Sequence, residues 1–391
     1  MALVCKAFGD IITFTRASSA TFTGSNGLIQ SAAIDAPRFD YDPVTLAAKG
    51  LLIEEQRTNL LTYSEDFSNA FWTKSNATVT ANATTAPDGL NTADTLVEDT
   101  ATSTHYVTTP TVTVTSGVPY TFSCYVKAAG RSWVRLADTA FSNVTAFFNV
   151  ATGVAGTIGS SVTANSITSV GNGWYRCTIT YATTTTGSTP RINVASADNT
   201  VSYTGDGTSG LFIWGAQLEA GAFATSYIPT VASQVTRSAD VASVNTLSPW
   251  YNSTEGTLYV EAQVFEINAG VTRYFASLND GTASNFSGIF KSTATAGGVT
   301  TTGGVSQGSL FSGTMTPLTT QKMALAYKTN DSAFTLNSAA PATDATVSLP
   351  VVNQLTIGSL ITGNSYVNSY IRRITYYPRR LSNAELQAIT A

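Results

Sequence analysis

Apolar and polar residues alternate with a period of two along most of this chain, and helical periodicity is nearly absent before the last ten residues. Successive side chains of a strand point to opposite faces, so this alternation predicts half-buried β-strands. Turn signals such as Gly171-Asn172-Gly173 separate the alternating runs. The strands predicted in the first half of the chain are residues 94–98, 104–114, 119–128, 133–138, 145–149, 174–181, 191–195 and 211–219.

The second half repeats this pattern after a polar stretch and ends in a helix signal. Strands are predicted at residues 256–262, 273–279, 323–328, 355–358 and 369–377, with the Gly/Thr-rich run 296–309 as a hairpin tip or surface loop. At the end, Ser382 can cap a first helical turn while Glu385 reaches back to it, and Leu381 and Leu386 can form a hydrophobic staple. These residues predict a short C-terminal helix.

Composition narrows the class of protein. Only 11% of the 391 residues are charged, against roughly 25% in average soluble domains. The formal net charge is −4 and the only basic runs are the pairs 372–373 and 379–380, so a nucleic-acid-binding role is excluded. No segment approaches the ~20 apolar residues of a membrane helix, and residues 1–10 lack the apolar core of a secretory signal. We expect synthesis in a cytoplasm and no membrane insertion.

Charged residues gather in clusters between residues 16 and 72, where large apolar residues, Gly and Pro separate them. Such a mixture suits a segment that docks onto another protein. The attachment residues predicted on this basis are Arg16, Arg38, Glu54, Glu55 and Arg57. The runs 16–21 (RASSAT), 37–43 (PRFDYDP) and 49–60 (KGLLIEEQRTNL) resemble the N-terminal region of bacteriophage head-fibre, head-spike and tail-fibre proteins. That resemblance implies a virion structural protein with phage capsid or tail proteins as partners, released by lysis of the host.

Two further resemblances concern the predicted sandwiches. The runs 120–128 (YTFSCYVKA), 173–176 (GWYR) and 212–221 (FIWGAQLEAG) resemble carbohydrate-binding jelly-roll modules of phage fibres and glycoside hydrolases. Such modules bind glycans or act as spacers. The end of the chain, residues 373–386, resembles the end of concanavalin-A-like and laminin-G-like sandwiches.

We therefore predict an all-β fold with a short C-terminal helix. Its parts are an extended virion-attachment segment (residues 1–61), a carbohydrate-binding-module-like sandwich (62–230), a linker (231–254) and a lectin-like sandwich (255–391). Phage fibres are commonly homotrimers, so a homotrimer is expected by analogy.

Catalytic chemistry has little support in the residues. The only histidine, His105, lies in a strand-like run, where a packing or surface role is more usual than a Ser/His/Asp site. One histidine and three scattered cysteines, Cys5, Cys124 and Cys177, supply neither a zinc site nor a disulfide framework, and the two in strands are expected to be buried and reduced. The acidic pairs 54–55, 65–66 and 98–99 are formal candidates for glycoside hydrolysis, but adjacent strand residues face opposite ways.

Calcium has some support, because lectin-like sandwiches often hold it through oxygen ligands. Asp40 with Asp42, and the pairs 279–280 and 330–331, could contribute such oxygens. Each pair is equally at home in a turn, where Asn and Asp cap their own backbone. We assign no metal ligands and expect no other cofactor.

Glycan binding has the clearest candidate residues. Sugars present apolar ring faces rimmed by hydroxyls, so their sites combine a flat aromatic with hydrogen-bonding groups. Alternation in residues 131–136 places Trp133 and Arg135 on one face of a strand, and Val134 and Leu136 on the other. Trp133 and Arg135 are therefore the predicted glycan-binding residues. The alternative is that Trp133 belongs to the core or a subunit contact, as we expect for the core tryptophans Trp174 and Trp214.

The function predicted from the sequence is a virion structural protein, a head fibre, spike or decoration protein, that displays sandwiches for adhesion to host-surface glycans. The alternative is a tail fibre or tailspike with polysaccharide-degrading activity. The absence of an internal repeat of solenoid period counts against a degrading tailspike. We predict a protein that is not an enzyme.

Overall fold

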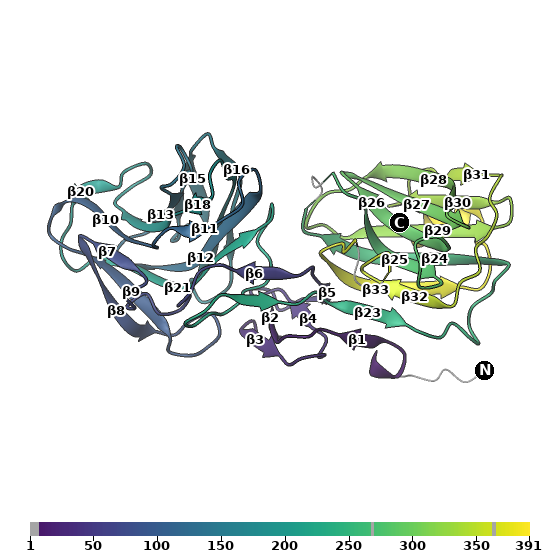
Figure 1. The fold of residues 1–391 in the computed structure, drawn as a ribbon, viewed down its shortest axis with the longest axis horizontal. Helices are drawn as coiled ribbons and strands as arrows, with labels where there is room; N and C mark the ends of the chain where they lie inside the picture. The colour runs from purple at the N-terminus through teal and green to yellow at the C-terminus, as the bar shows by residue number, and fades with distance from the viewer. Residues whose placement is uncertain (1–7, 267–269, 362–364) are drawn as a thin grey trace.

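The computed structural model describes residues 8–266, 270–361 and 365–391, and it is built almost wholly of antiparallel strands. Two β-sandwiches lie side by side along the long axis, with the N-terminal strands beneath them (Figure 1). The C-terminus lies on the second sandwich (Figure 1). The predicted all-β class is confirmed.

The first sandwich has two main sheets. One runs in the order β15 (Val154–Ile158), β14 (Thr145–Asn149), β13 (Trp133–Asp138), β19 (Pro190–Ala195), β10 (Thr102–Thr108) and β20 (Ser202–Thr204), with β7 (Thr73–Ser75) also paired to β10. The other runs in the order β16 (Val162–Ser169), β17 (Tyr175–Ala182), β12 (Pro119–Ala129), β21 (Gly210–Ala220), β9 (Ala93–Glu98) and β8 (Ala77–Thr84). The short pair β11 (Val112–Thr113) and β18 (Gly187–Ser188) lies apart from both sheets.

Alternate residues of these strands fill the space between the two sheets. On β12, Phe122, Cys124 and Val126 are fully buried in the first core. Cys124 lies directly opposite Cys177 of β17, and both thiols are free and buried, as predicted, while Cys5 lies outside the described residues. Burial raises the pKa of Cys124 to about 12, so these cysteines act as small apolar side chains.

The second sandwich packs two seven-stranded sheets around one core. The first sheet runs in the order β1 (Thr13–Thr15), β23 (Val241–Val244), β32 (Gln354–Ile357), β25 (Arg273–Asn279), β26 (Phe286–Ser292), β27 (Thr295–Thr302) and β28 (Val305–Thr314). The second runs in the order β31 (Ala342–Asp344), β30 (Ser332–Leu336), β29 (Gln321–Lys328), β24 (Glu255–Val264), β33 (Ser369–Tyr377), β5 (Ala48–Ile53) and β4 (Phe39–Tyr41).

The N-terminal segment is not the extended arm that the sequence predicted. β1 extends one sheet of the second sandwich, and β4 and β5 extend the other. The reason is apolar burial: Phe14, Leu51 and Ile53 belong to the core of that sandwich. Between these strands β2 (Ala20–Thr23) and β3 (Ile29–Ala32) form a hairpin. The described part of residues 1–61 is therefore built into the fold: β1, β4 and β5 belong to the second sandwich, while Leu61 is buried in the core of the first.

The predicted linker is also folded. Within residues 231–254, β22 (Val235–Arg237) pairs with β6 (Arg57–Asn59), and β23 lies between β1 and β32. The Gly/Thr-rich run 296–309 is a hairpin of β27 and β28 that turns at Gly303-Gly304, and Ala296 and Leu310 are buried in the core. Of the two alternatives the run is thus a hairpin, with its β27 half buried and residues 303–309 mostly exposed.

The C-terminal helix α1 (Asn383–Ile389) forms as predicted. Ser382 Oγ accepts a hydrogen bond from the Glu385 backbone, and the Glu385 carboxylate accepts one from the Ser382 backbone, which completes a capping box. Leu381 and Leu386 are buried together in a small apolar cluster against β29 and β30. Among the described residues, no helix has the length and apolar character to cross a membrane.

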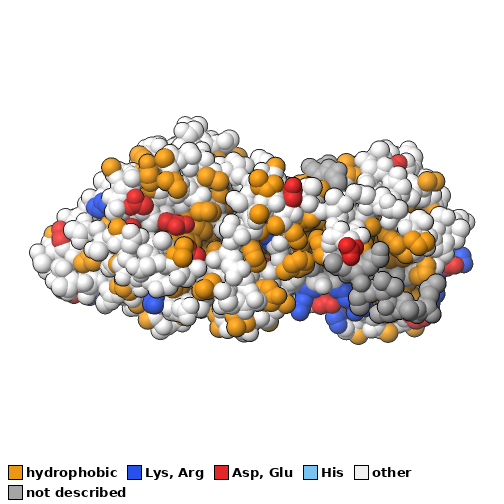
Figure 2. Space-filling model, turned by 90° about the horizontal axis from the view of Figure 1, so that it is seen from below, with side chains coloured by type: hydrophobic (Ala, Val, Ile, Leu, Met, Phe, Trp, Pro, Cys, Tyr) orange, Lys and Arg blue, Asp and Glu red, His pale blue; other side chains and the backbone are white. Residues whose placement is uncertain are grey.

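The surface reflects the low charge content of the sequence. On the face seen from below, charged side chains are few; one group of basic and acidic side chains gathers at the edge on the side of the second sandwich, and the others are scattered among uncharged ones (Figure 2). Uncharged polar side chains cost less to desolvate than Lys or Glu when another surface approaches.

Candidate functional site

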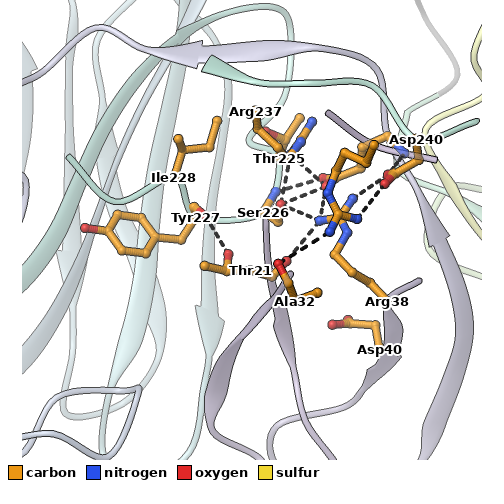
Figure 3. Close-up of polar contacts among 12 residues, drawn as sticks. Thr21, Ala32, Arg38, Asp40, Thr225, Ser226, Tyr227, Ile228, Arg237 and Asp240 are labelled. Carbon is orange, nitrogen blue, oxygen red and sulfur yellow. Dashed lines mark hydrogen bonds and ion pairs between the residues drawn. The ribbon is translucent and has the colours of Figure 1, made fainter. Parts of the chain in front are cut away.

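Four of the five predicted attachment residues, Arg16, Arg38, Glu54 and Arg57, are buried. Arg16, Arg38 and Glu54 have relative exposures of 1%, 0% and 1% and meet Arg237 and Asp240, which sequence reasoning missed. Arg16 Nη1 lies 3.1 Å from Asp240 Oδ1, Arg38 Nη1 lies 2.8 Å from Glu54 Oε2, and Arg237 Nη1 lies 2.7 Å from the same oxygen. Arg38 also pairs with Asp240 (Figure 3). These five residues are called the arginine–carboxylate cluster below.

The arginines of this cluster keep its carboxylates charged. Burial alone would raise the pKa of Glu54, but the charges of Arg237 and Arg38, with two hydrogen bonds from Ser226, lower it to about 2. Ser226 donates from its backbone nitrogen at 2.8 Å and from its hydroxyl at 2.7 Å. Because Ser226 follows the last strand of the first sandwich, the cluster ties that sandwich to the N-terminal segment.

Glu55 and Arg57, the other two predicted attachment residues, also pair within the chain. The Glu55 carboxylate lies 2.6 Å from Arg57 Nη2 and 3.1 Å from Arg273 Nη1 on β25. The Arg57 guanidinium lies over the ring of Phe223, 5.2 Å from its centroid. All five predicted residues therefore form contacts within the chain, and the prediction that these charges form a docking surface is wrong for the four that are buried, Arg57 included.

The predicted glycan-binding residues lie on the outer face of the β13 sheet. Val134 and Leu136 are fully buried in the first core, whereas Trp133 and Arg135 point the other way and are partly exposed. Trp133 is thus not a core tryptophan, unlike Trp174 and Trp214, each of which is 1% exposed. The arrangement on the strand is the one that alternation predicted.

Neighbouring strands add side chains to this face that sequence reasoning missed. Asn193 of β19 lies opposite Arg135, and it also lies opposite Tyr106 of β10. Arg191 lies two positions before Asn193 on β19 and therefore on the same face of that strand. Trp133, Arg135, Tyr106, Arg191 and Asn193 are called the Trp133 face below.

The polar groups of the Trp133 face are unusually free of partners. Asn193 is fully buried, yet neither its amide nitrogen nor its amide oxygen has a hydrogen-bond partner among the described residues. The Arg191 guanidinium stacks on Tyr106 at 3.8 Å from the ring centroid, and its Nε is also without a partner there. An unpaired buried polar group costs about 1–3 kcal/mol, so a ligand that pairs with these groups would recover free energy.

Trp133 is held at the edge of this face by close packing against β15. A Cβ atom added at Gly156 would lie 2.7 Å from Cζ3 of Trp133 and still closer to the Asp198 carboxylate, so a larger residue there would displace one of these side chains. A fixed, partly exposed ring beside free donors suits stacking against the apolar face of a sugar while its hydroxyls are hydrogen-bonded.

A groove of about 800 Å³ between the two sandwiches is the second candidate site. Its lining includes Tyr125 and Arg176 of the first sandwich, Tyr370 of the second, and Asp40 of the N-terminal segment. These polar groups already have partners: Arg176 Nη1 donates to Thr225 O at 2.6 Å, and Asp40 accepts from Thr23 N at 2.6 Å. The groove therefore offers space, while its Arg176 and Asp40 side chains are already used within the fold.

The other residues considered for chemistry are used inside the fold. His105 is fully buried, with Nδ1 2.6 Å from Asn76 O and Nε2 3.3 Å from Tyr203 O. The Glu98 carboxylate accepts from Arg131 Nε at 2.9 Å and from the Asp206 backbone at 2.9 Å.

The oxygens considered for calcium do not converge on one point. Asp280 Oδ1 accepts from the Thr282 backbone at 2.9 Å, and its other oxygen accepts from Asn285 at 2.9 Å. In the ranges 8–266, 270–361 and 365–391, no group of three or more His, Cys, Asp or Glu side chains could hold a metal ion.

Comparisons with known proteins give only weak similarities. No known protein family and no curated protein matches the sequence. Among solved structures, the carbohydrate-binding module of the Ruminococcus gnavus IT-sialidase, bound to α2,3-sialyllactose, is 18% identical, with 36% of this chain and 84% of that one covered and a TM-score of 0.31.

Two tandem-domain structures match more of the chain at still lower scores. The LG1–3 region of the laminin α2 chain is 11% identical, with coverage of 72% of this chain and 67% of that one and a TM-score of 0.28. The tandem CBM22 domains of Paenibacillus barcinonensis Xyn10C are 12% identical, with coverage of 83% and 99% and a TM-score of 0.26. These similarities are too weak to assign a ligand to this chain.

Proposed function

We propose that this protein is a glycan-binding adhesion protein carried on a bacteriophage particle, where its first sandwich binds host-surface sugars through the Trp133 face. The single observation that supports binding there is a partly exposed tryptophan beside polar groups without partners in the fold, Arg191 and Asn193 among them. The resemblance of residues 16–72 to phage fibre and spike proteins supports the virion location. Head or tail attachment and the expected homotrimer stay predictions.

Replacing Trp133 by Ala is expected to weaken binding to host polysaccharide about thirty-fold. Loss of a central aromatic contact costs about 2 kcal/mol at a binding hot spot, which is the corresponding free energy. Binding of the purified chain to a glycan array, followed by titration with the best ligand, measures this. The matched control is Phe311→Ala, since Phe311 is a half-exposed aromatic on the second sandwich. Equal affinity of the Trp133→Ala variant and the wild type would place the site elsewhere.

Attachment is expected to use exposed apolar side chains of the N-terminal segment, because its buried charges are already paired. Ile34 and Val44 are 60% and 58% exposed. The double variant Ile34→Asp/Val44→Asp should lower the amount of protein on purified particles at least about tenfold, the effect of roughly 1.4 kcal/mol. Quantitative immunoblots of sedimented particles measure it.

The control for attachment is Val351→Asp, because Val351 is 87% exposed and lies far along the chain in the second sandwich. Particles that carry the double variant and this control in equal amounts would refute attachment through the exposed side chains of residues 34 and 44.

A further inference from the structure

The Trp133 face holds two positive charges with no ion-pair partner. Arg135 Nε donates to Thr145 Oγ1 at 2.6 Å, but its guanidinium forms no ion pair among the described residues. Arg191 forms neither a hydrogen bond through its side chain nor an ion pair there, and only stacks on Tyr106. Other buried or partly buried arginines, such as Arg38 and Arg131, meet a carboxylate, whereas Arg176 donates only to uncharged groups, Ser123 Oγ and Thr225 O.

These two charges lie close enough to interact. Ala137 of β13 is opposite Arg191, so Arg135 and Arg191 are diagonal neighbours on one face of adjacent strands. Burial, and then the charge of Arg191, lower the pKa of Arg135. Arginine is not deprotonated in proteins at neutral pH. The face thus carries a like-charge pair that an anion would stabilise.

Asn193 supplies a second, independent observation. It lies directly opposite Arg135 and two residues along β19 from Arg191, with both amide atoms buried and without a partner in the described part of the chain. An amide offers donors and an acceptor together, which match the hydroxyls of a sugar ring. The Asp198 carboxylate lies near Trp133, beside Gly156, but it forms no ion pair with Arg135 or Arg191. Its oxygens accept instead from the Thr157 backbone at 2.8 Å and from the Thr157 hydroxyl at 3.0 Å.

We propose that the ligand of the Trp133 face is an acidic glycan whose carboxylate pairs with Arg135 and Arg191 while a hydroxyl of the same or the next sugar reaches Asn193. The proposal rests on the proposed glycan-binding function of this face. A carboxylate is planar and matches the guanidinium fork, which gives a directional, charge-assisted contact. Trp133 at the edge of the face would then stack on the ring that carries or adjoins the acid.

The test measures binding of the intact chain to a polyuronate and to the same polymer after its carboxyl groups are reduced to alcohols. We expect binding to the polyuronate at least about tenfold tighter, and a loss of about ten- to one-hundred-fold for Arg135→Gln and for Arg191→Gln, as for hydrogen bonds to charged groups. Arg373→Gln is the matched control, because it removes the same charge from an exposed position on the second sandwich. Circular dichroism confirms that each variant is folded.

The outcomes separate this inference from the function on which it depends. Equal affinity for the polyuronate and its reduced form, with Trp133→Ala still weakening both, would overturn the acidic ligand and leave glycan binding standing. Tighter binding to a sulfated polymer than to the polyuronate would contradict the proposal that the acidic group of the ligand is a carboxylate. No binding to any polysaccharide, host polysaccharide included, would overturn the proposed function itself.

Discussion

Replacing Asp240 by Ala is expected to destabilise the protein by about 3–5 kcal/mol, the cost of leaving a buried charge without its partner. Asp240 pairs with Arg16 and with Arg38, and the side chains of all three have 0% exposure. Without it, Arg16 would lose its ion-pair partner, and Arg38 would keep only the Glu54 carboxylate that it shares with Arg237. Chemical denaturation followed by tryptophan fluorescence measures the free energy of the transition that includes the second sandwich.

The control for this prediction is Asp331→Ala. Asp331 also pairs with an arginine, Arg380, at 2.8 Å, but its side chain is half-exposed. Such surface pairs contribute about 0–1 kcal/mol, so this variant should unfold almost like the wild type. A loss below about 1 kcal/mol for Asp240→Ala would contradict the interior position of the arginine–carboxylate cluster.

Acid is expected to weaken the same cluster through Glu54. The folded pKa of Glu54 is lowered from 4.5 to about 2, so its stabilising contribution is present above pH 4.5 and is lost as pH falls through 2. A depression of that size corresponds to roughly 3 kcal/mol. The unfolding free energy of the wild type and that of Glu54→Gln should be measured from pH 6 to pH 2. The difference between them should shrink by about this amount over that range.

Using the difference between the two proteins removes the contribution of other carboxyl groups. Burial raises the pKa values of Glu65 and Asp94, whose contributions run in the opposite direction and occur in both proteins. If the gap stays constant down to pH 2, Glu54 does not meet Arg38 and Arg237 as described.

The sequence predicted the elements of this fold better than their partners. Alternation gives the face of each strand residue, and local capping signals fixed α1. Neither signal reports which strand lies beside which. Thr13–Thr15 is three residues long and pairs with Val241–Val244, more than 220 positions away. The N-terminal segment was therefore mistaken for an arm.

Charges were misread for a related reason. In a chain with so few charged residues, a cluster of Arg and Glu suggests a contact surface, but it is equally the composition of a paired interior network. Arg16 and Asp240 are separated by 224 positions, so no local pattern connects them. Arg38 comes immediately before β4, which a turn joins to the partly buried β5. This position fits a contact surface and an interior network equally well.

The candidate site could be predicted in part. Val134 and Leu136 fixed the orientation of Trp133 and Arg135, because they alternate with them. The same alternation in β19, with Ile192 and Val194 buried, would have placed Asn193 on the opposite face. β19 lies beside β13 through a non-local pairing. The contact between Asn193 and Arg135 could therefore not be predicted from local sequence patterns.

The most direct test of glycan binding at the Trp133 face is a crystal structure of the chain with the oligosaccharide that it retains best. We predict a sugar ring stacked on Trp133, with polar groups within hydrogen-bonding distance of Asn193 or Arg191. An oligosaccharide bound instead in the groove between the two sandwiches, with the Trp133 face empty, would contradict that account.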